Sequence, residues 1–102
     1  NIIVISSEKM SEGAIAGTVI TATEAKTRAL IDKGLEFTGT TSDAIIIAYE
    51  QKGEGEPIFY SGPATPFGSR VSKLVRAGVK EALKAYYGTD DVDKWQLSFH
   101  DK

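Results

Sequence analysis

The sequence contains no cysteine and a single histidine, His100, close to the carboxyl end. The absence of cysteine excludes disulfides and thiolate metal sites. A metal site built from several histidines is excluded too, as is a Ser-His-Asp triad unless His100 folds back into the site. Any hydrolytic chemistry must therefore use hydroxyls, carboxylates, lysine and backbone N–H groups. We expect neither a metal ion nor a cofactor.

The chain also lacks a long apolar run and an excess of charge of either sign. No apolar stretch approaches the roughly 20 residues that a membrane-spanning helix needs. The 12 basic and 14 acidic residues are interspersed, and the formal net charge is −2. This balance leaves no electrostatic footprint for nucleic acid or for an anionic membrane. At 102 residues the chain is expected to form a single domain, residues 1–102, with one core.

Two apolar segments predict strands, and a third segment predicts a long helix. Residues 1–5 and 44–49 are rich in β-branched side chains, which favour strands. The helix is expected to begin at Pro66 after the N-cap Thr65 and to end at Gly88. Apolar residues at three- and four-residue steps predict one buried face on it, made of Val71, Leu74, Val75, Val79 and Leu83.

Gly78 lies within that apolar stripe. Glycine inside a helix costs about 1 kcal/mol relative to alanine, so its presence calls for a reason. A close approach of the helix to the sheet at Gly78 is the reason that we expect.

The segment before residue 38 is harder to interpret. Residues 14–20 are apolar but include a glycine, and their β-branched members favour a strand. Thr21 and Glu24 match a capping box, in which each side chain bonds the other residue's backbone N–H. This predicts a helix that begins at Thr21 and ends before Gly34, a suitable C′ residue.

The order of elements predicts an α/β (α+β) fold, a two-layer sandwich with helices on one face of a mixed, mostly antiparallel sheet. Residues 57–60 read as a strand antiparallel to residues 44–49, because so short a connection cannot make a parallel crossover. Loops 38–43 and 61–68 are both rich in glycine and hydroxyls and flank this predicted hairpin. We expect them to line one cleft.

Loop 38–43 carries four hydroxyls, a glycine and the carboxylate of Asp43 at the mouth of the most apolar strand. Functional sites often consist of such a polar loop on a rigid scaffold. The alternative is a plain turn held by bonds between side chains and the backbone, which Thr, Ser and Asp readily make.

Three pieces, taken in order, carry a resemblance. Residues 20–30 contain Thr-Glu-Ala-Lys, residues 38–45 read Thr-Gly-Thr-Thr-Ser-Asp-Ala-Ile, and residues 60–68 contain Gly-Pro-Ala-Thr-Pro-Phe-Gly. Together they resemble the adenosylcobinamide amidohydrolase family over about residues 1–88, as its C-terminal portion. The resemblance implies a prokaryotic, cytoplasmic enzyme of cobamide salvage. Such an enzyme hydrolyses the amide that joins aminopropanol to the corrin ring and releases adenosylcobyric acid.

The expected site residues come from these motifs. The expected catalytic residues are Asp43, Glu24, Thr40 and Thr41. The expected ligand-binding residues are Lys26, Thr38, Gly39, Ser42, Gly62, Thr65 and Gly68. Asp43 would act as a general base or orient a water or a threonine. Each also has a structural alternative: a turn carboxylate, the partner in a capping box, a backbone cap, a turn glycine or a solvated lysine.

Two further classes of function remain open. One is a small ligand-binding or regulatory module that uses loops 38–43 and 61–68 without catalysis. The other is a structural subunit that needs a partner to complete its sheet. The chain begins with Asn1 rather than methionine, directly at a predicted strand. We expect residues 1–5 either to pair inside the sheet or to associate through an exposed edge. Association is favoured, as a homo-oligomer or with a separate N-terminal chain.

Overall fold

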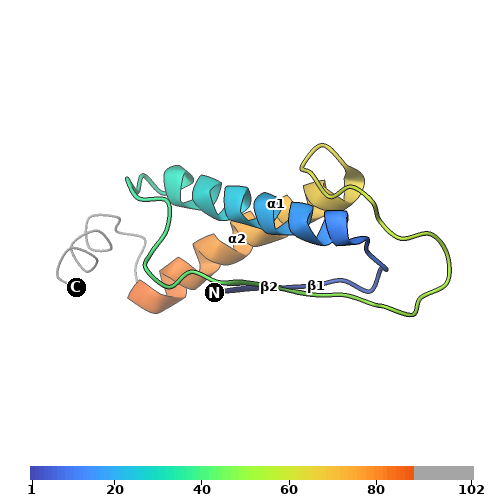
Figure 1. Ribbon diagram of the computed structural model, residues 1–102. Helices are drawn as coiled ribbons and strands as arrows, with labels where there is room; N and C mark the ends of the chain where they lie inside the picture. The colour runs from blue at the N-terminus through green and yellow to red at the C-terminus, as the bar shows by residue number, and fades with distance from the viewer. Residues whose placement is uncertain (89–102) are drawn as a thin grey trace.

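The computed structural model describes residues 1–88, which form two strands and two helices in the order β1, α1, β2, α2 (Figure 1). The strands are β1 (Ile2–Ile5) and β2 (Ile45–Ala48), and the helices are α1 (Glu12–Asp32) and α2 (Pro66–Tyr87). The α+β character expected from the sequence is confirmed. His100 lies outside the described residues. No helix in the part that is described is long and apolar enough to cross a bilayer.

The sheet is parallel, so the prediction of a mostly antiparallel sheet is wrong. Ile2 pairs with Ile45 and Ile5 with Ala48, and α1 makes the crossover between the two strands. The predicted hairpin after β2 does not form. Residues 49–57 instead lead the chain away from the sheet (Figure 1), and Ile58 makes an isolated parallel bridge with Met10.

Helix α1 begins nine residues earlier than the predicted capping box, which corrects both expectations for residues 14–24. The N-cap is Ser11, whose hydroxyl accepts the Ala14 N–H at 3.1 Å. Thr21 lies inside the helix, is 1% exposed and donates its hydroxyl to the carbonyl of Ser61 at 2.7 Å. Small side chains let this half of α1 pack closely, and a Cβ at Gly17 would lie 2.7 Å from Ser61 Oγ. Tertiary packing therefore outweighs the strand preference of these β-branched residues.

The carboxyl end of α1 is a Schellman turn, in agreement with the predicted role of Gly34. Gly34 has φ 79° and donates to the carbonyl of Ile31, while Leu35 donates to the carbonyl of Leu30. Leu30 and Leu35 are both buried and form a small apolar cluster. This turn ends the helix and sends the chain back alongside it.

Helix α2 has the predicted bounds but not the full predicted buried face. Val71 and Val75 are buried and Val79 is half-buried, whereas Leu74 is 73% exposed, so its predicted burial is wrong. The expected close approach at Gly78 is wrong as well, because a Cβ there would meet nothing within 4 Å. The reason for both is that the described sheet is too narrow to cover the whole stripe.

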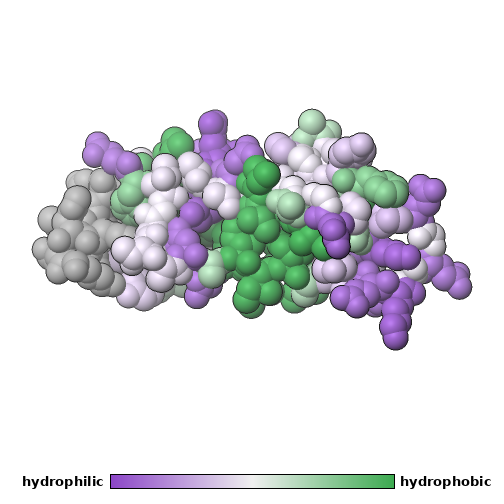
Figure 2. All heavy atoms as spheres, in the orientation of Figure 1, coloured by the Kyte–Doolittle hydropathy of each residue, from purple (hydrophilic) through white to green (hydrophobic). Residues whose placement is uncertain are grey.

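The main core lies between the two helices and one face of the sheet. Ala22 and Ala25 of α1 pack with Val71 and Val75 of α2, and side chains from both strands close the cluster: Ile2, Val4 and Ile45. The opposite face of the sheet is open and apolar, with Ile3, Ile5 and Ile46 all more than half exposed. Figure 2 shows apolar side chains gathered at the centre of the molecule over the strands and α2.

Candidate functional site

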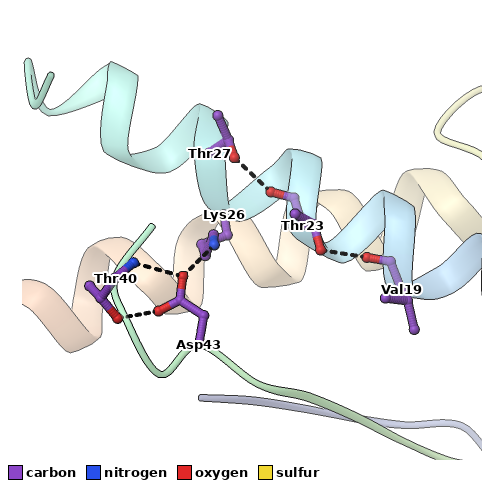
Figure 3. Close-up of polar contacts among 6 residues, drawn as sticks. All are labelled: Val19, Thr23, Lys26, Thr27, Thr40 and Asp43. Carbon is purple, nitrogen blue, oxygen red and sulfur yellow. Dashed lines mark hydrogen bonds and ion pairs between the residues drawn. The ribbon is translucent and has the colours of Figure 1, made fainter. Parts of the chain in front are cut away.

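Lys26, Thr40 and Asp43 form a polar cluster between α1 and the loop before β2 (Figure 3). The ammonium of Lys26 donates to Asp43 Oδ2 at 2.6 Å, and the backbone N–H of Thr40 donates to the same oxygen at 3.1 Å. The Thr40 hydroxyl donates to Asp43 Oδ1. The carboxylate of Asp43 therefore accepts three hydrogen bonds, one from helix α1 and two from Thr40 in the loop.

Local sequence explains why these side chains meet. The Schellman turn after α1 reverses the chain, so residues 38–43 lie back beside the helix and within reach of Lys26. Gly39 lets the loop pass close to the ion pair. A Cβ on Gly39 would lie 2.7 Å from Asp43 Oδ2 and 3.1 Å from Lys26 Nζ. Any larger residue in place of the glycine of the Thr-Gly-Thr motif would therefore displace the paired side chains of Asp43 and Lys26.

The electrostatics of the cluster keep Asp43 ionised. The hydrogen bond from Lys26 and then that from the Thr40 hydroxyl lower the pKa of Asp43 from 3.8 to about 2. Its side chain is 33% exposed and that of Lys26 is 17% exposed, so solvent reaches both. At neutral pH the cluster presents an ammonium and a hydroxyl oriented by one carboxylate. A carboxylate with so low a pKa is a weak proton acceptor.

Loop 61–68 has a different environment, inside the packing of the two helices. Ser61 is 2% exposed, and its hydroxyl donates to the carbonyl of Ala14 at 2.6 Å. Thr65 is the N-cap of α2 and accepts the N–H of Gly68 at 3.0 Å. A Cβ on Gly68 would lie 1.9 Å from the carbonyl oxygen of Gly62. Ser61, Thr65 and Gly68 therefore each have a structural role. Gly62 contributes its carbonyl, which accepts the hydroxyl of Thr65 at 2.7 Å.

The two loops do not line one cleft, so that expectation is wrong. Loop 38–43 precedes β2, at the amino end of the parallel strands, while loop 61–68 lies beyond their carboxyl ends (Figure 1). The cause is the parallel sheet: without a hairpin, residues 49–60 carry the chain to the far end of α1. There Ser61 contacts Ala14 and Thr21, whereas Asp43 contacts Lys26.

The remaining residues predicted in this part of the chain make no hydrogen bond or ion pair with Lys26 or Asp43. Glu24 is exposed, and because residues two apart on a helix do not face each other, it lies on a different face from Lys26. Three hydroxyl side chains of the loop are also exposed: Thr38, Thr41 and Ser42. They are free to meet a ligand that approaches the cluster from solvent.

Two features were missed by sequence reasoning. One is a groove of about 510 Å³ between β1 and α2, which the exposed Leu74 lines. The other is Asp32, where Arg28, Arg76 and Lys80 converge and hold its pKa well below the ordinary value, chiefly through hydrogen bonds from Arg76 and Lys80. The i,i+4 spacing of Arg28 and Asp32 was the available signal for the second. Among residues 1–88 no group of three metal-ligating side chains gathers.

Comparison with known proteins points to one family. The family model described as adenosylcobinamide amidohydrolase matches residues 1–91. An adenosylcobinamide amidohydrolase of Methanosarcina mazei is 43% identical over 91 residues, covering 82% of this chain and 46% of the relative. One of Halobacterium salinarum is 36% identical over 83 residues, covering 81% of this chain and 35% of the relative. An uncharacterized protein of Methanocaldococcus jannaschii is 37% identical over 91 residues, covering 81% and 34%.

No solved structure matches the chain. The chain spans less than half the length of each of these curated relatives. The match to the family model includes α1, the loop before β2 and α2, and so includes the Lys26–Asp43 cluster.

Proposed function

The chain belongs to the adenosylcobinamide amidohydrolase family, and we propose that it takes part in the hydrolysis of adenosylcobinamide. In the proposed reaction, the amide C–N bond between aminopropanol and the corrin side chain breaks. The carbonyl carbon gains the oxygen of water, and the amine leaves with a proton. The products are aminopropanol and adenosylcobyric acid, a reaction of cobamide salvage in the cytoplasm. The proposed partner is therefore a corrinoid.

The observation that carries this proposal is that Lys26 and Thr40 both donate hydrogen bonds to Asp43. Lys26 and Thr40 come from two separate motifs that resemble those of the family. Amide hydrolysis needs an attacking oxygen and donors for the negative charge that develops on the carbonyl oxygen. The Thr40 hydroxyl is the candidate for attack or for orienting a water, and the proton that the attacking oxygen loses passes to the departing amine. The Lys26 ammonium is the candidate donor to the developing oxyanion.

The low pKa of Asp43 favours one of its two predicted roles. Proton transfer is most efficient when the pKa of the acceptor lies near the working pH, and that of Asp43 lies far below neutrality. Asp43 therefore orients Thr40 and keeps Lys26 in place, rather than taking the proton itself. The exposed hydroxyls of Thr38, Thr41 and Ser42, with the N–H of Gly39, would contact the substrate. Glu24 lies on a different face of α1 from Lys26 and takes no part in the proposed reaction.

A second candidate is a corrinoid-binding module without hydrolytic activity. The observation that favours it is the length of the chain, which spans 46% of the Methanosarcina mazei relative. Catalytic groups that the longer relatives carry elsewhere would then be required for turnover. The same exposed hydroxyls would hold the amide without cleaving it.

One assay separates the two candidates. The purified chain is incubated with adenosylcobinamide, and released aminopropanol is quantified while the corrinoid absorbance reports binding. The matched control is Glu36→Gln, which changes an exposed carboxylate in the preceding loop. The amidohydrolase is supported if aminopropanol is released, if Asp43→Asn abolishes the release, and if Glu36→Gln does not alter it. Binding without release supports the module, and the absence of both contradicts each candidate.

A further inference from the structure

An open apolar groove lies between β1 and α2. Its volume is about 510 Å³, and its lining comes from residues 1–8 and from α2, with no residue of β2. It therefore lies on the side of β1 that is turned away from β2. Leu74 of α2 is 73% exposed and Ile3 of β1 is 63% exposed, and both line it. The groove forms part of the apolar surface at the centre of Figure 2.

The edge of β1 along this groove has unpaired backbone groups. Ile2 and Ser6 donate their N–H groups to the carbonyls of Ala44 and Ala48, on the β2 side. Because backbone groups alternate along a strand, those of Ile3 and Ile5 point to the other edge. Within the described chain the sheet ends there, since it has only two strands. Parallel sheets are almost always covered on both faces, and a two-stranded sheet alone is marginal in water.

Gly78 adds a separate observation. It lies near the middle of α2, where glycine is unfavourable, and it lines the groove. No atom lies within 4 Å of the position that its Cβ would take, so packing within residues 1–88 does not explain it. Glycine in such a place is typical of a site where another backbone passes closely.

We propose that the groove receives a third strand, an extended apolar segment from the part of the family unit that lies outside these 102 residues. This strand pairs with the free edge of β1 and lies over Leu74 and Gly78. The Methanosarcina mazei relative and the two others are matched over only 46%, 35% and 34% of their lengths, so each holds ample further chain to supply it. The inference rests on family membership and does not require the proposed hydrolysis.

A second copy of this chain fits the groove less well. Two copies that paired through β1 would be related by a two-fold axis between the two β1 strands. Since α2 forms the floor beside that edge, α2 and its copy would both lie beneath the same two strands. Neighbouring strands are only about 5 Å apart, whereas a helix with its side chains is about 10 Å wide. The two helices would collide.

The test is co-expression of the 102-residue chain with the unmatched portion of the Methanosarcina mazei relative, with the tag on the latter alone. We expect the two to co-purify as a one-to-one complex. The amide protons of Ile3 and Ile5 should exchange at least tenfold more slowly in the complex than in the chain alone. Those of Ile2 and Ser6, already bonded to β2, should change less. In a second protein, a flexible linker joins the 102-residue chain to the unmatched portion. The linker raises the effective concentration of the two parts, so that even weak pairing slows amide exchange measurably.

Two variants and one matched control locate the contact. Leu74→Lys should weaken the complex tenfold or more, and the melting temperature of the chain alone should change little because Leu74 is exposed. Gly78→Ala should raise that melting temperature yet weaken the complex. Gly13→Ala, in the exposed first turn of α1 and outside the groove lining, should leave the affinity unchanged within twofold.

Four results would overturn the proposal. The first is failure to co-purify together with unchanged exchange of Ile3 and Ile5 in the linked version. The second is a complex that Leu74→Lys does not weaken. The third is a dimer of the chain alone that Leu74→Lys dissociates, which would make a second copy the occupant. The fourth is slow exchange of Ile3 and Ile5 in the monomer that is lost on truncation after Gly88, which would assign the groove to residues 89–102.

Discussion

Loops 38–43 and 61–68 are built from the same residue types, yet they have opposite roles. The polar side chains of loop 61–68 bond the protein itself: Ser61 is buried and bonds α1, and Thr65 caps α2. In loop 38–43 every residue is exposed, and the hydroxyl of Thr40 bonds a carboxylate that solvent also reaches. One loop joins the two helices, and the other presents polar groups to solvent.

The difference lies in what each polar group bonds. Hydroxyls that donate to backbone carbonyls in a dry interior have used their one donor and are shielded from a ligand, and moving them costs stability. Hydroxyls on a solvated loop cost little to expose and remain free to meet a substrate. Both loops contain a tightly packed glycine: Gly39 lies beside the side chains of a charged pair, and Gly68 lies beside backbone, where a larger residue cannot fit. The atoms beside each glycine, and not the presence of a glycine, distinguish the candidate functional loop 38–43 from the structural loop 61–68.

Gly68→Ala should have the largest effect, because it tests the structural role of loop 61–68. The new methyl group would lie 1.9 Å from the carbonyl oxygen of Gly62, which is backbone and cannot move aside without moving the loop. We expect a loss of about 3 kcal/mol or more in the free energy of unfolding, measured by urea denaturation. Gly78→Ala, whose methyl group meets nothing within 4 Å, is the control and should stabilise α2. Equal effects of the two would show that loop 61–68 does not hold the helices together.

Asp43→Asn should act on turnover and not on the fold. The substitution removes the charge that holds Lys26 and orients Thr40, and we expect hydrolysis of adenosylcobinamide to fall by about 100-fold or more. The free energy of unfolding should change by less than about 1 kcal/mol, because the ion pair is partly exposed. A variant that unfolds, or one that retains full turnover, would place Asp43 with the structural loop.

A matched pair of threonines on α1 tests the buried contact of loop 61–68. Thr21→Val removes the hydroxyl that bonds the carbonyl of Ser61 in a dry site, which should cost about 1–2 kcal/mol in the free energy of unfolding. Thr23→Val removes an exposed hydroxyl that bonds only the carbonyl of Val19 on its own helix, and should change it by less than about 0.5 kcal/mol. Thermal unfolding of both variants measures the difference. Equal losses would contradict a special role for the contact with Ser61.

The smallest expected effect is the protonation of Asp43 at low pH, which should change only loop 38–43. The pKa of Asp43 is lowered from 3.8 to about 2, so the folded state prefers the ionised carboxylate. The stability from its contacts is therefore fully present above about pH 4 and is lost as the pH falls towards 2. The NMR signal of the Asp43 carboxyl carbon should titrate with a midpoint near 2, together with the Thr40 amide. A midpoint at 3.8 or above would mean that Lys26 and Thr40 do not hold the carboxylate in solution.

Much of the candidate site could be predicted from the sequence, although its internal geometry could not. Asp43, Thr40 and Lys26 were all singled out as site residues, and the structure brings the three together. The turn at Gly34 could be predicted locally, but the pairing of Asp43 with Lys26 also depends on the path of residues 35–43 back along α1, which no local pattern specifies. The expected joint cleft with loop 61–68 failed because it relied on a hairpin.

Features that depend on neighbouring residues could be predicted from the sequence. Thr65, Pro66 and Gly88 bound α2, Gly34 ends α1, and β-branched runs form β1 and β2. These signals act within a few residues, so they need no knowledge of the rest of the fold. The order of the motifs likewise indicated the family.

Features that depend on residues far apart in the sequence follow only from tertiary packing. Residues 14–20 became helix because Ala14 and Gly17 pack against Ser61, which is more than 40 residues away. The sheet is parallel because α1, now long enough, makes a crossover between β1 and β2. Leu74 is exposed because the two described strands leave part of α2 uncovered. Periodicity marks which side chains can be buried together, but only the packed partners determine which of them are.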